Sequence, residues 1–155
     1  MKNFWRYLLI LILIAGVVIR IKNFTAPLVD AHAMRQTDTE CVAYFLSKGK
    51  ASFLMPKACL MRPVSNTDGY FFLEMPFYEG LIALGYKILG SEIWVGRLVN
   101  LILYCVGSLA LFGLLKDWIN KTTAIFGVLI YSFMPGSIFF VGHAIHPDAM
   151  AVSLI

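Results

Sequence analysis

The sequence predicts an all-α protein that crosses a membrane several times. Of its 155 residues, 59% are hydrophobic and 14% are charged, whereas a soluble domain is about half apolar and about a quarter charged. Three stretches carry the apolar excess: Phe4–Ile19, Leu98–Leu115 and Thr122–Gly142. Because roughly 20 mostly apolar residues span the hydrocarbon core as a helix, each stretch is a candidate transmembrane helix.

The first stretch is the shortest and contains one charged residue, Arg6. Basic residues flank it, namely Lys2 before it and Arg20 and Lys22 after it. Long basic side chains reach the membrane interface by snorkelling, and Trp5 and Tyr7 suit the aromatic belt. A cleaved signal peptide is the alternative, but the only A-x-A pattern, at 31–33, lies too far along the chain. We therefore expect an uncleaved span over about 4–21.

The other two stretches contain no Asp, Glu, Lys or Arg. They predict spans over about 94–115 and 122–142. The apolar residues at 149–155 predict the start of a fourth span, over 148–155. From these segments we expect residues 1–155 to be the N-terminal part of one transmembrane domain, either of a longer protein or of a truncated gene product.

Basic residues in short loops predict the topology, because such loops stay in the cytoplasm. Lys2 and Arg6 place the N-terminus there, and so does the short link Lys116–Lys121. The long loop over about 22–92 is then extracytoplasmic, as is the end of the third span. The net charge of +4 follows from this topology. The sequence contains no basic stripe interleaved with aromatic residues, so it does not indicate nucleic-acid binding.

Two helices are expected within the outer loop. Asp38–Lys48 has a short apolar face and ends at a glycine. The second helix, over about 76–89, begins at Pro76 and carries apolar residues at helical spacing: Phe77, Leu81, Leu84 and Ile88. Glu79 and Lys87 lie off that stripe, which favours a helix along the membrane surface over a short span. Cys41 and Cys59 either pair in an oxidising compartment or remain two thiols.

Ionisable side chains beside membrane spans are costly and usually serve function. They gather in the outer loop and just beyond the third span, together with the hydrogen-bonding amide of Gln36: Asp30, His32, Arg35, Asp38, Glu40, Glu74, His146 and Asp148. A carboxylate there can act as a general base or orient a metal ion, and Arg35 is suited to a phosphate. The competing interpretation is a charged loop that is simply solvated. His143, His146 and Asp148 also resemble a metal-ligand cluster, although Pro147 and the short spacing make joint coordination awkward.

Four segments, in order, resemble a large group of bacterial polytopic glycosyltransferases with the GT-C fold. These enzymes are related to the dolichyl-phosphate-mannose–protein mannosyltransferases and the lipid A aminoarabinose transferases. The matching segments are H-A-M-R-Q-T-D-T at His32–Thr39, E-M-P-F-Y-E-G-L-I-A-L-G-Y-K-I-L-G at Glu74–Gly90, G-R-L-V-N at Gly96–Asn100, and a third span followed by H-P-D-A within Pro135–Ala149. Met34 departs from the pattern, since the family usually has Trp there.

The resemblance implies a GT-C-like set of N-terminal helices and a glycosyltransferase that uses a polyprenyl-phosphate sugar donor. It implies transfer to an acceptor on the outer side of the cell (inner) membrane. It also implies a catalytic base in the outer loop, for which Asp38 is preferred over Asp30. Substrate-binding residues are then expected at His32, Arg35, Gln36, Glu74, His146 and Asp148.

A divalent metal ion stays open as a cofactor, with Asp38, His146 and Asp148 as candidate ligands. Membrane lipids are the other expected partners, and the sequence gives no oligomeric state. Two alternatives remain, a non-catalytic membrane scaffold and a transporter subunit. A transporter is expected to carry acids within its spans, near the bilayer midplane, and the complete apolar stretches contain none.

Overall fold

The computed structural model describes residues 2–22, 24–29, 32–59, 69–70 and 75–154. Every regular element in these ranges is helical, with only two isolated β-bridges, Ser52 to Met55 and Lys57 to Tyr70. This confirms the all-α class. The chain forms two compact units. The membrane unit comprises Met1–Phe24, Asn100–His143 and Asp148–Ile155, and the loop unit comprises Thr25–Val99 and Ala144–Pro147.

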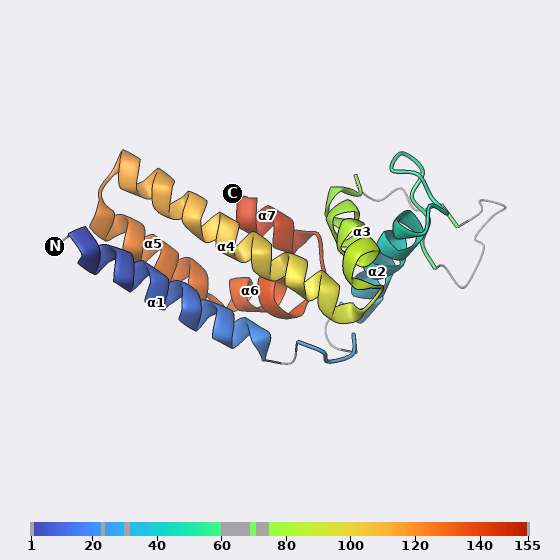
Figure 1. Cartoon of the computed structure of the whole chain (residues 1–155), viewed down its shortest axis with the longest axis horizontal. Helices are drawn as coiled ribbons and strands as arrows, with labels where there is room; N and C mark the ends of the chain where they lie inside the picture. The colour runs from blue at the N-terminus through green and yellow to red at the C-terminus, as the bar shows by residue number, and fades with distance from the viewer. Residues whose placement is uncertain (1, 23, 30–31, 60–68, 71–74, 155) are drawn as a thin grey trace. The chain divides into compact units, whose positions relative to one another are not determined.

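The membrane unit is built on two long apolar helices, α1 (Lys2–Ile21) and α4 (Ile93–Trp118), of which α4 begins in the loop unit. Both are long and apolar enough to cross a membrane. Helix α5 (Lys121–Phe133) lies beside α1 (Figure 1). Their shared core contains Leu9, Ile12, Ile125 and Val128. The outward faces of α1 and α4 remain apolar, as expected for helices that contact lipid or further helices.

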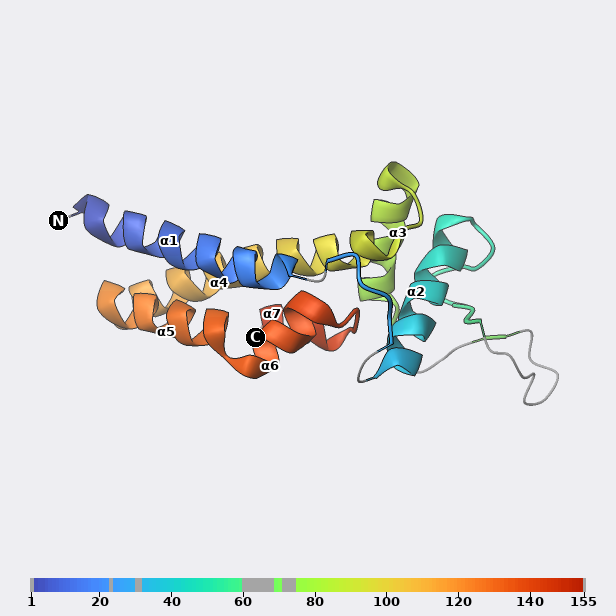
Figure 2. The same ribbon diagram turned by 90° about the horizontal axis from the view of Figure 1, so that it is seen from below.

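The expected span over 122–142 is not one straight helix. Helix α5 ends at Phe133, and the chain continues as α6 (Pro135–Ile138) and the π-helix η1 (Phe139–His143). The two parts are bent by 59° at the break, which is visible as a sharp turn in Figure 2. Pro135 accounts for the bend, because its ring and missing N–H interrupt a helix. If the bent pair is one span, the described chain has three candidate spans. A short helix, α7 (Asp148–Leu154), follows.

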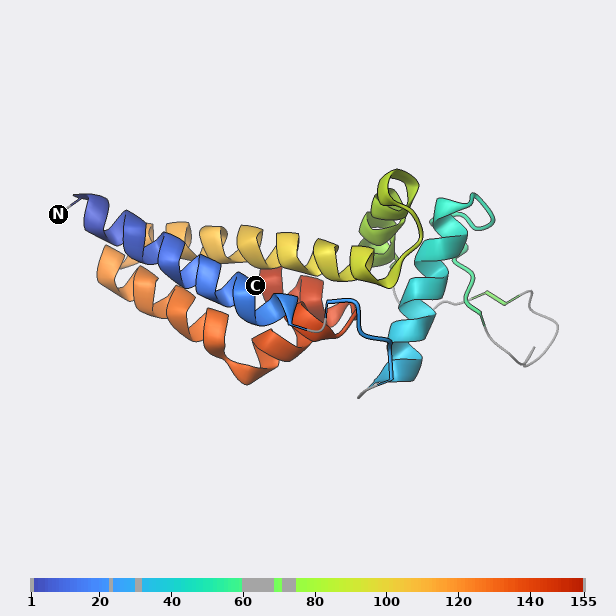
Figure 3. The ribbon, with the colours of Figure 1, turned by 60° about the horizontal axis from the view of Figure 1, so that its bottom comes forward.

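In the loop unit, α2 (Ala33–Ser47) packs against α3 (Phe77–Leu89), as Figure 3 shows. Helix α2 begins five residues before the Asp38 start that the sequence predicts. The polar residues Gln36 and Thr39 occupy its buried face. The polar motif at 32–39 is therefore mostly helical. Tertiary contacts bury polar side chains that the sequence places in a loop.

Helix α3 has an unusual distribution of apolar residues. The predicted stripe of Phe77, Leu81, Leu84 and Ile88 is exposed, with Ile88 at 81%. The buried face instead contains Tyr78, Glu79, Ile82, Ala83 and Tyr86. An outward apolar stripe is typical of a helix that contacts a membrane or another protein.

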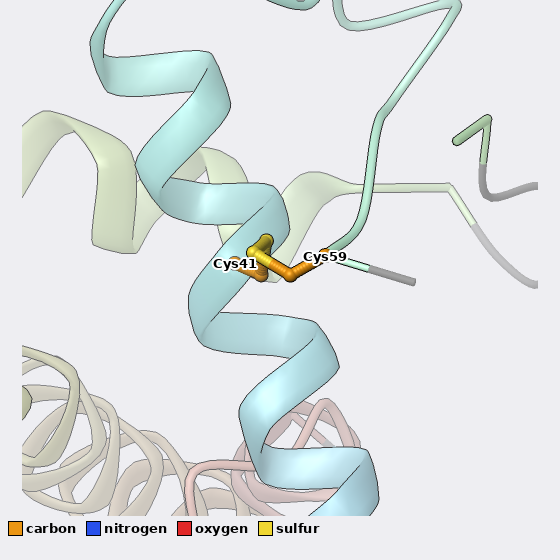
Figure 4. Close-up of a disulfide and its surroundings, with 2 residues drawn as sticks. All are labelled: Cys41 and Cys59. Atoms are coloured by element: carbon orange, nitrogen blue, oxygen red, sulfur yellow. A yellow bond between two sulfur atoms is a disulfide. The ribbon is translucent and has the colours of Figure 1, made fainter. Parts of the chain in front are cut away.

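A disulfide joins Cys41 of α2 to Cys59, with the two Cα atoms 5.7 Å apart (Figure 4). The sequence left this pairing open. The bridge fixes the irregular segment that follows α2 to the middle of that helix.

Candidate functional site

The first three turns of α2 carry four of the side chains that the sequence singled out, namely Arg35, Gln36, Asp38 and Glu40. Gln36 is fully buried, and its Oε1 accepts a hydrogen bond of 3.1 Å from the backbone N–H of Ile145. This bond attaches the segment Ala144–Pro147 to α2. Residues separated by more than a hundred positions in the sequence are thereby brought together within the loop unit.

The same attachment brings two of the predicted histidines together. The rings of His32 and His146 have centroids 6.0 Å apart and are tilted by 60°. His32 directly precedes α2 and has a left-handed backbone, with φ 64° and ψ 24°. A non-glycine residue in this region is strained, and such strain persists where surrounding contacts impose it, often at functional sites. The histidine pair is therefore a defined feature of the site.

Asp38, the preferred catalytic base, is half-buried on α2. Burial raises the pKa of Asp38 above its usual value, and the nearby charge of Arg35 partly opposes this effect. A carboxylate with a raised pKa is a better proton acceptor, provided the pH keeps it ionised. Asp38 is therefore a half-buried carboxyl group on which the charge of Arg35 acts.

Glu40 and Arg97 form a second ionisable pair, which the sequence did not predict. The Oε1 atom of Glu40 is buried, without a hydrogen-bond partner among the described residues. It lies so close to Gly96 that a Cβ there would come within 2.8 Å of it. Burial raises the pKa of Glu40 to about 8, against the opposing charge of Arg97. Arg97 is itself buried and donates a 2.6 Å hydrogen bond to the carbonyl of Ala26.

The signal for this pair was present in the G-R-L-V-N motif. Gly96 and Arg97 both belong to that motif, but the family resemblance assigns no role to either residue. In the structure, the absence of a side chain at Gly96 admits the Glu40 carboxyl group, and the charge of Arg97 acts on the same carboxyl group.

Three other predicted site residues have different outcomes. Asp30 and Glu74 lie outside the described residues. Asp148 is the first residue of α7, in the membrane unit, and is exposed. Among the residues that the structure describes, no three or more His, Cys, Asp or Glu side chains gather to hold a metal ion.

Comparison with known families adds the decisive observation. The sequence model of the family described as Dolichyl-phosphate-mannose-protein mannosyltransferase matches residues 74–155, just over half of the chain. The chain belongs to this mannosyltransferase family. No curated protein and no solved structure gives a significant match.

Membership in this mannosyltransferase family makes the chain a multi-pass membrane protein of a glycosyltransferase family, in agreement with its apolar helices. The matched range includes α3, α4, the bent third segment and His146. Helix α2, with Asp38 and Arg35, precedes that range. The roles of these two residues therefore rest on the motif at 32–39 and on their surroundings in the structure.

Proposed function

We propose that this mannosyltransferase-family protein transfers a sugar from a polyprenyl-phosphate donor to an acceptor on the extracytoplasmic side of the cell membrane. The observation that carries the proposal is the family match. The donor class is favoured because a membrane-embedded transferase meets a lipid-linked substrate within the bilayer. Mannose is the first sugar to test, because the family description names it.

In the proposed reaction, Asp38 removes the proton from the acceptor hydroxyl group as its oxygen attacks the anomeric carbon. The bond from that carbon to the phosphate oxygen breaks, and its electron pair leaves with the phosphate. The transition state resembles an oxocarbenium ion. Arg35, whose charge already acts on Asp38, would stabilise the departing phosphate through bidentate hydrogen bonds.

The remaining predicted residues have binding roles in this proposal. The His32 and His146 rings would contact the sugar or acceptor, and Gln36 positions the segment that carries His146. Asp148 and Glu74 would bind substrate, and Asp30 is the alternative base.

Two features of the loop unit support an extracytoplasmic location. The Cys41–Cys59 bridge is the kind of crosslink that persists in oxidising compartments. The exposed apolar stripe of α3 suits a helix that lies on the outer membrane–water interface. We propose the same topology as the basic residues predict, with the N-terminus in the cytoplasm.

The catalytic role is tested with the full chain in membranes, using polyprenyl-phosphate mannose as the donor. Asp38→Asn should lower the transfer rate by about 100-fold or more, the contribution expected of a general base. Glu92→Gln is the matched control, because Glu92 is an exposed carboxylate of the same unit. Equal rates for Asp38→Asn and the control would remove Asp38 as the base.

The pH profile provides a second readout of the same role. A general base must be ionised, so the wild-type rate should fall as the pH drops through the pKa of Asp38. Because that pKa is raised, the fall should occur at a higher pH than for an ordinary aspartate. Asp38→Asn should abolish this limb of the profile, whereas Glu92→Gln should leave it in place.

A further inference from the structure

Arg20, near the end of α1, is a buried cation on which no carboxylate of the described residues acts. It is 2% exposed. Its guanidinium group donates to the carbonyls of Gly16 and Ser132 at 3.0 Å each, and to the Ser137 hydroxyl at 2.8 Å. It also stacks on the ring of Tyr104, 3.9 Å from the centroid. In the described part of the chain, none of the groups that act on Arg20 is a carboxylate.

An isolated buried charge is costly, and a guanidinium group stays protonated instead of becoming neutral. The Nε–H of Arg20 is also buried, without a hydrogen-bond partner among the described residues. Buried charges in membrane segments usually pair with an opposite charge or serve function. Since no acid among the described residues of the membrane unit acts on Arg20, an anion from outside the chain would lower this cost.

A cleft of about 490 Å³ lies directly at Arg20. Lys22 and His143 line it together with the apolar side chains of Ile19, Ile138 and Phe139, and no Asp or Glu is among its described lining residues. One wall is the bent segment that contains Pro135 and the π-helix η1, an element often found at functional sites. At Gly142 in this wall, a Cβ would come within 2.6 Å of the Arg20 Cγ. The cleft is therefore closely built around a cation and attracts anions.

A second groove shows what kind of anion fits. It has a volume of about 520 Å³ and runs between α1 and α5, with lining side chains that are apolar except for Thr122. Among the residues that line the two hollows, Leu8, Leu11 and Ala15 of α1 lie in the apolar groove, and Ile19 of α1 and Lys22, directly after the helix, lie in the cleft. They follow one another at spacings of three and four, so they form a single stripe on the helix.

An occupant that follows this stripe meets an apolar surface first and a cationic cleft next. From Leu11 to Lys22 the helix rises about 16 Å. That order of surfaces matches a molecule with a hydrocarbon tail and an anionic head. A free phosphate ion would satisfy the cleft alone and leave the apolar groove unused.

We propose that the two hollows bind one membrane lipid, with its phosphate headgroup in the cleft of Arg20, Lys22 and His143 and its acyl chain along α1 and α5. This site is independent of the proposed sugar transfer, since it needs neither Asp38 nor an acceptor. The cation–phosphate contacts set the position of the headgroup, and the apolar groove sets the direction of the chain.

The test measures binding of phosphatidylglycerol to the full chain in detergent by native mass spectrometry. Diacylglycerol, which lacks the phosphate, and inorganic phosphate, which lacks the chain, are the comparison ligands. Both should bind more weakly than phosphatidylglycerol. Equal binding of diacylglycerol would overturn the headgroup contact, and equal binding of inorganic phosphate would overturn the choice of a lipid.

Three variants locate the site. Lys22→Ala removes an exposed cation of the cleft and should weaken phosphatidylglycerol binding roughly fivefold, the effect of one basic residue at an anionic membrane surface. Ile138→Trp fills the cleft while keeping its charges and should weaken binding at least as much. Lys121→Ala removes an exposed lysine of the same unit outside the cleft and should leave binding unchanged. Wild-type affinity in both Lys22→Ala and Ile138→Trp would refute the proposed site.

Discussion

Arg20 in the membrane unit and Arg97 in the loop unit are equally buried, at 2% exposure each, but their surroundings differ. The charge of Arg97 acts on the carboxyl group of Glu40 within its own unit. Arg20 is held by carbonyls, a hydroxyl group and an aromatic ring. In the loop unit, the carboxyl group of Glu40 can thus interact with the buried cation Arg97. In the membrane unit, we propose that an anion from outside the chain interacts with the buried cation Arg20. Burial alone does not tell these two situations apart.

The largest expected effect concerns the two sides of the membrane. In a Cys105→Ala background, a cysteine at Lys50 of the loop unit should react with a membrane-impermeant thiol reagent in intact cells. A cysteine at Lys121, in the link between α4 and α5, should react only after lysis. Both positions are exposed, so the difference reports topology. Labelling of both cysteines in intact cells would refute the proposed orientation.

Replacing Arg20 tests the cation of the membrane unit. Arg20→Met removes the hydrogen bonds to Ser132 and Ser137 and the stacking on Tyr104. We expect the free energy of unfolding to fall by about 2 kcal/mol, since hydrogen bonds to charged groups contribute about 1.5–3 kcal/mol each and the lost burial of charge offsets part of this. Unfolding in detergent, followed by circular dichroism, measures the change.

The control for Arg20→Met is Arg6→Met, which removes the same charge from an exposed position of the same helix. It should change stability by less than about 0.5 kcal/mol. If the two variants unfold alike, the contacts of Arg20 do not contribute to the fold.

Glu40 should make the stability of the loop unit depend on pH, and the shift of its pKa fixes the sign of that dependence. Its pKa is about 8 in the folded chain and 4.5 in an ordinary glutamate, so the folded state binds the proton more tightly. The stability that Glu40 contributes is therefore complete below about pH 4.5 and is lost as the pH rises towards 8. Glu40→Gln should flatten this decline in unfolding measurements between pH 5 and 8. Glu92→Gln, which alters an exposed carboxylate of the same unit, is the control, and an equal slope in both variants would contradict the assignment to Glu40.

The smallest effect is expected at His32. Glycine can adopt the left-handed backbone conformation of His32 without strain. His32→Gly should therefore raise the free energy of unfolding of the loop unit by up to about 1 kcal/mol. If the ring pair with His146 serves substrate binding, the same variant should raise the KM for the sugar donor or acceptor. Unchanged stability together with unchanged kinetics would leave the strained backbone without the proposed role.

Helix class and the long apolar helices followed from composition, because a run of about 20 uncharged apolar residues has few other stable forms in a membrane. The early start of α2 did not follow, since Gln36 and Thr39 are polar but buried by tertiary contacts. Arg20 was expected only as a flanking charge at the interface. In the structure α6 and η1 supply groups that cover it, and no local sequence pattern encodes such long-range packing.

The candidate site shows the same division between local and long-range information. The motif at 32–39 identified Asp38 and Arg35 because chemistry-bearing residues are adjacent in the sequence. The contacts of His32 with His146 and of Gln36 with Ile145 depend on how the chain returns after the third span. The proximity of Glu40 to Gly96 depends on the same long-range packing.

The close approach at Gly142 couples two distant positions. A methyl group there would displace the aliphatic stem of Arg20 or push η1 away from α1. A homologue that keeps the arginine should therefore keep the glycine, and one that loses the arginine is released from that requirement. Covariation of positions 20 and 142 across homologues would be the evolutionary record of this packing.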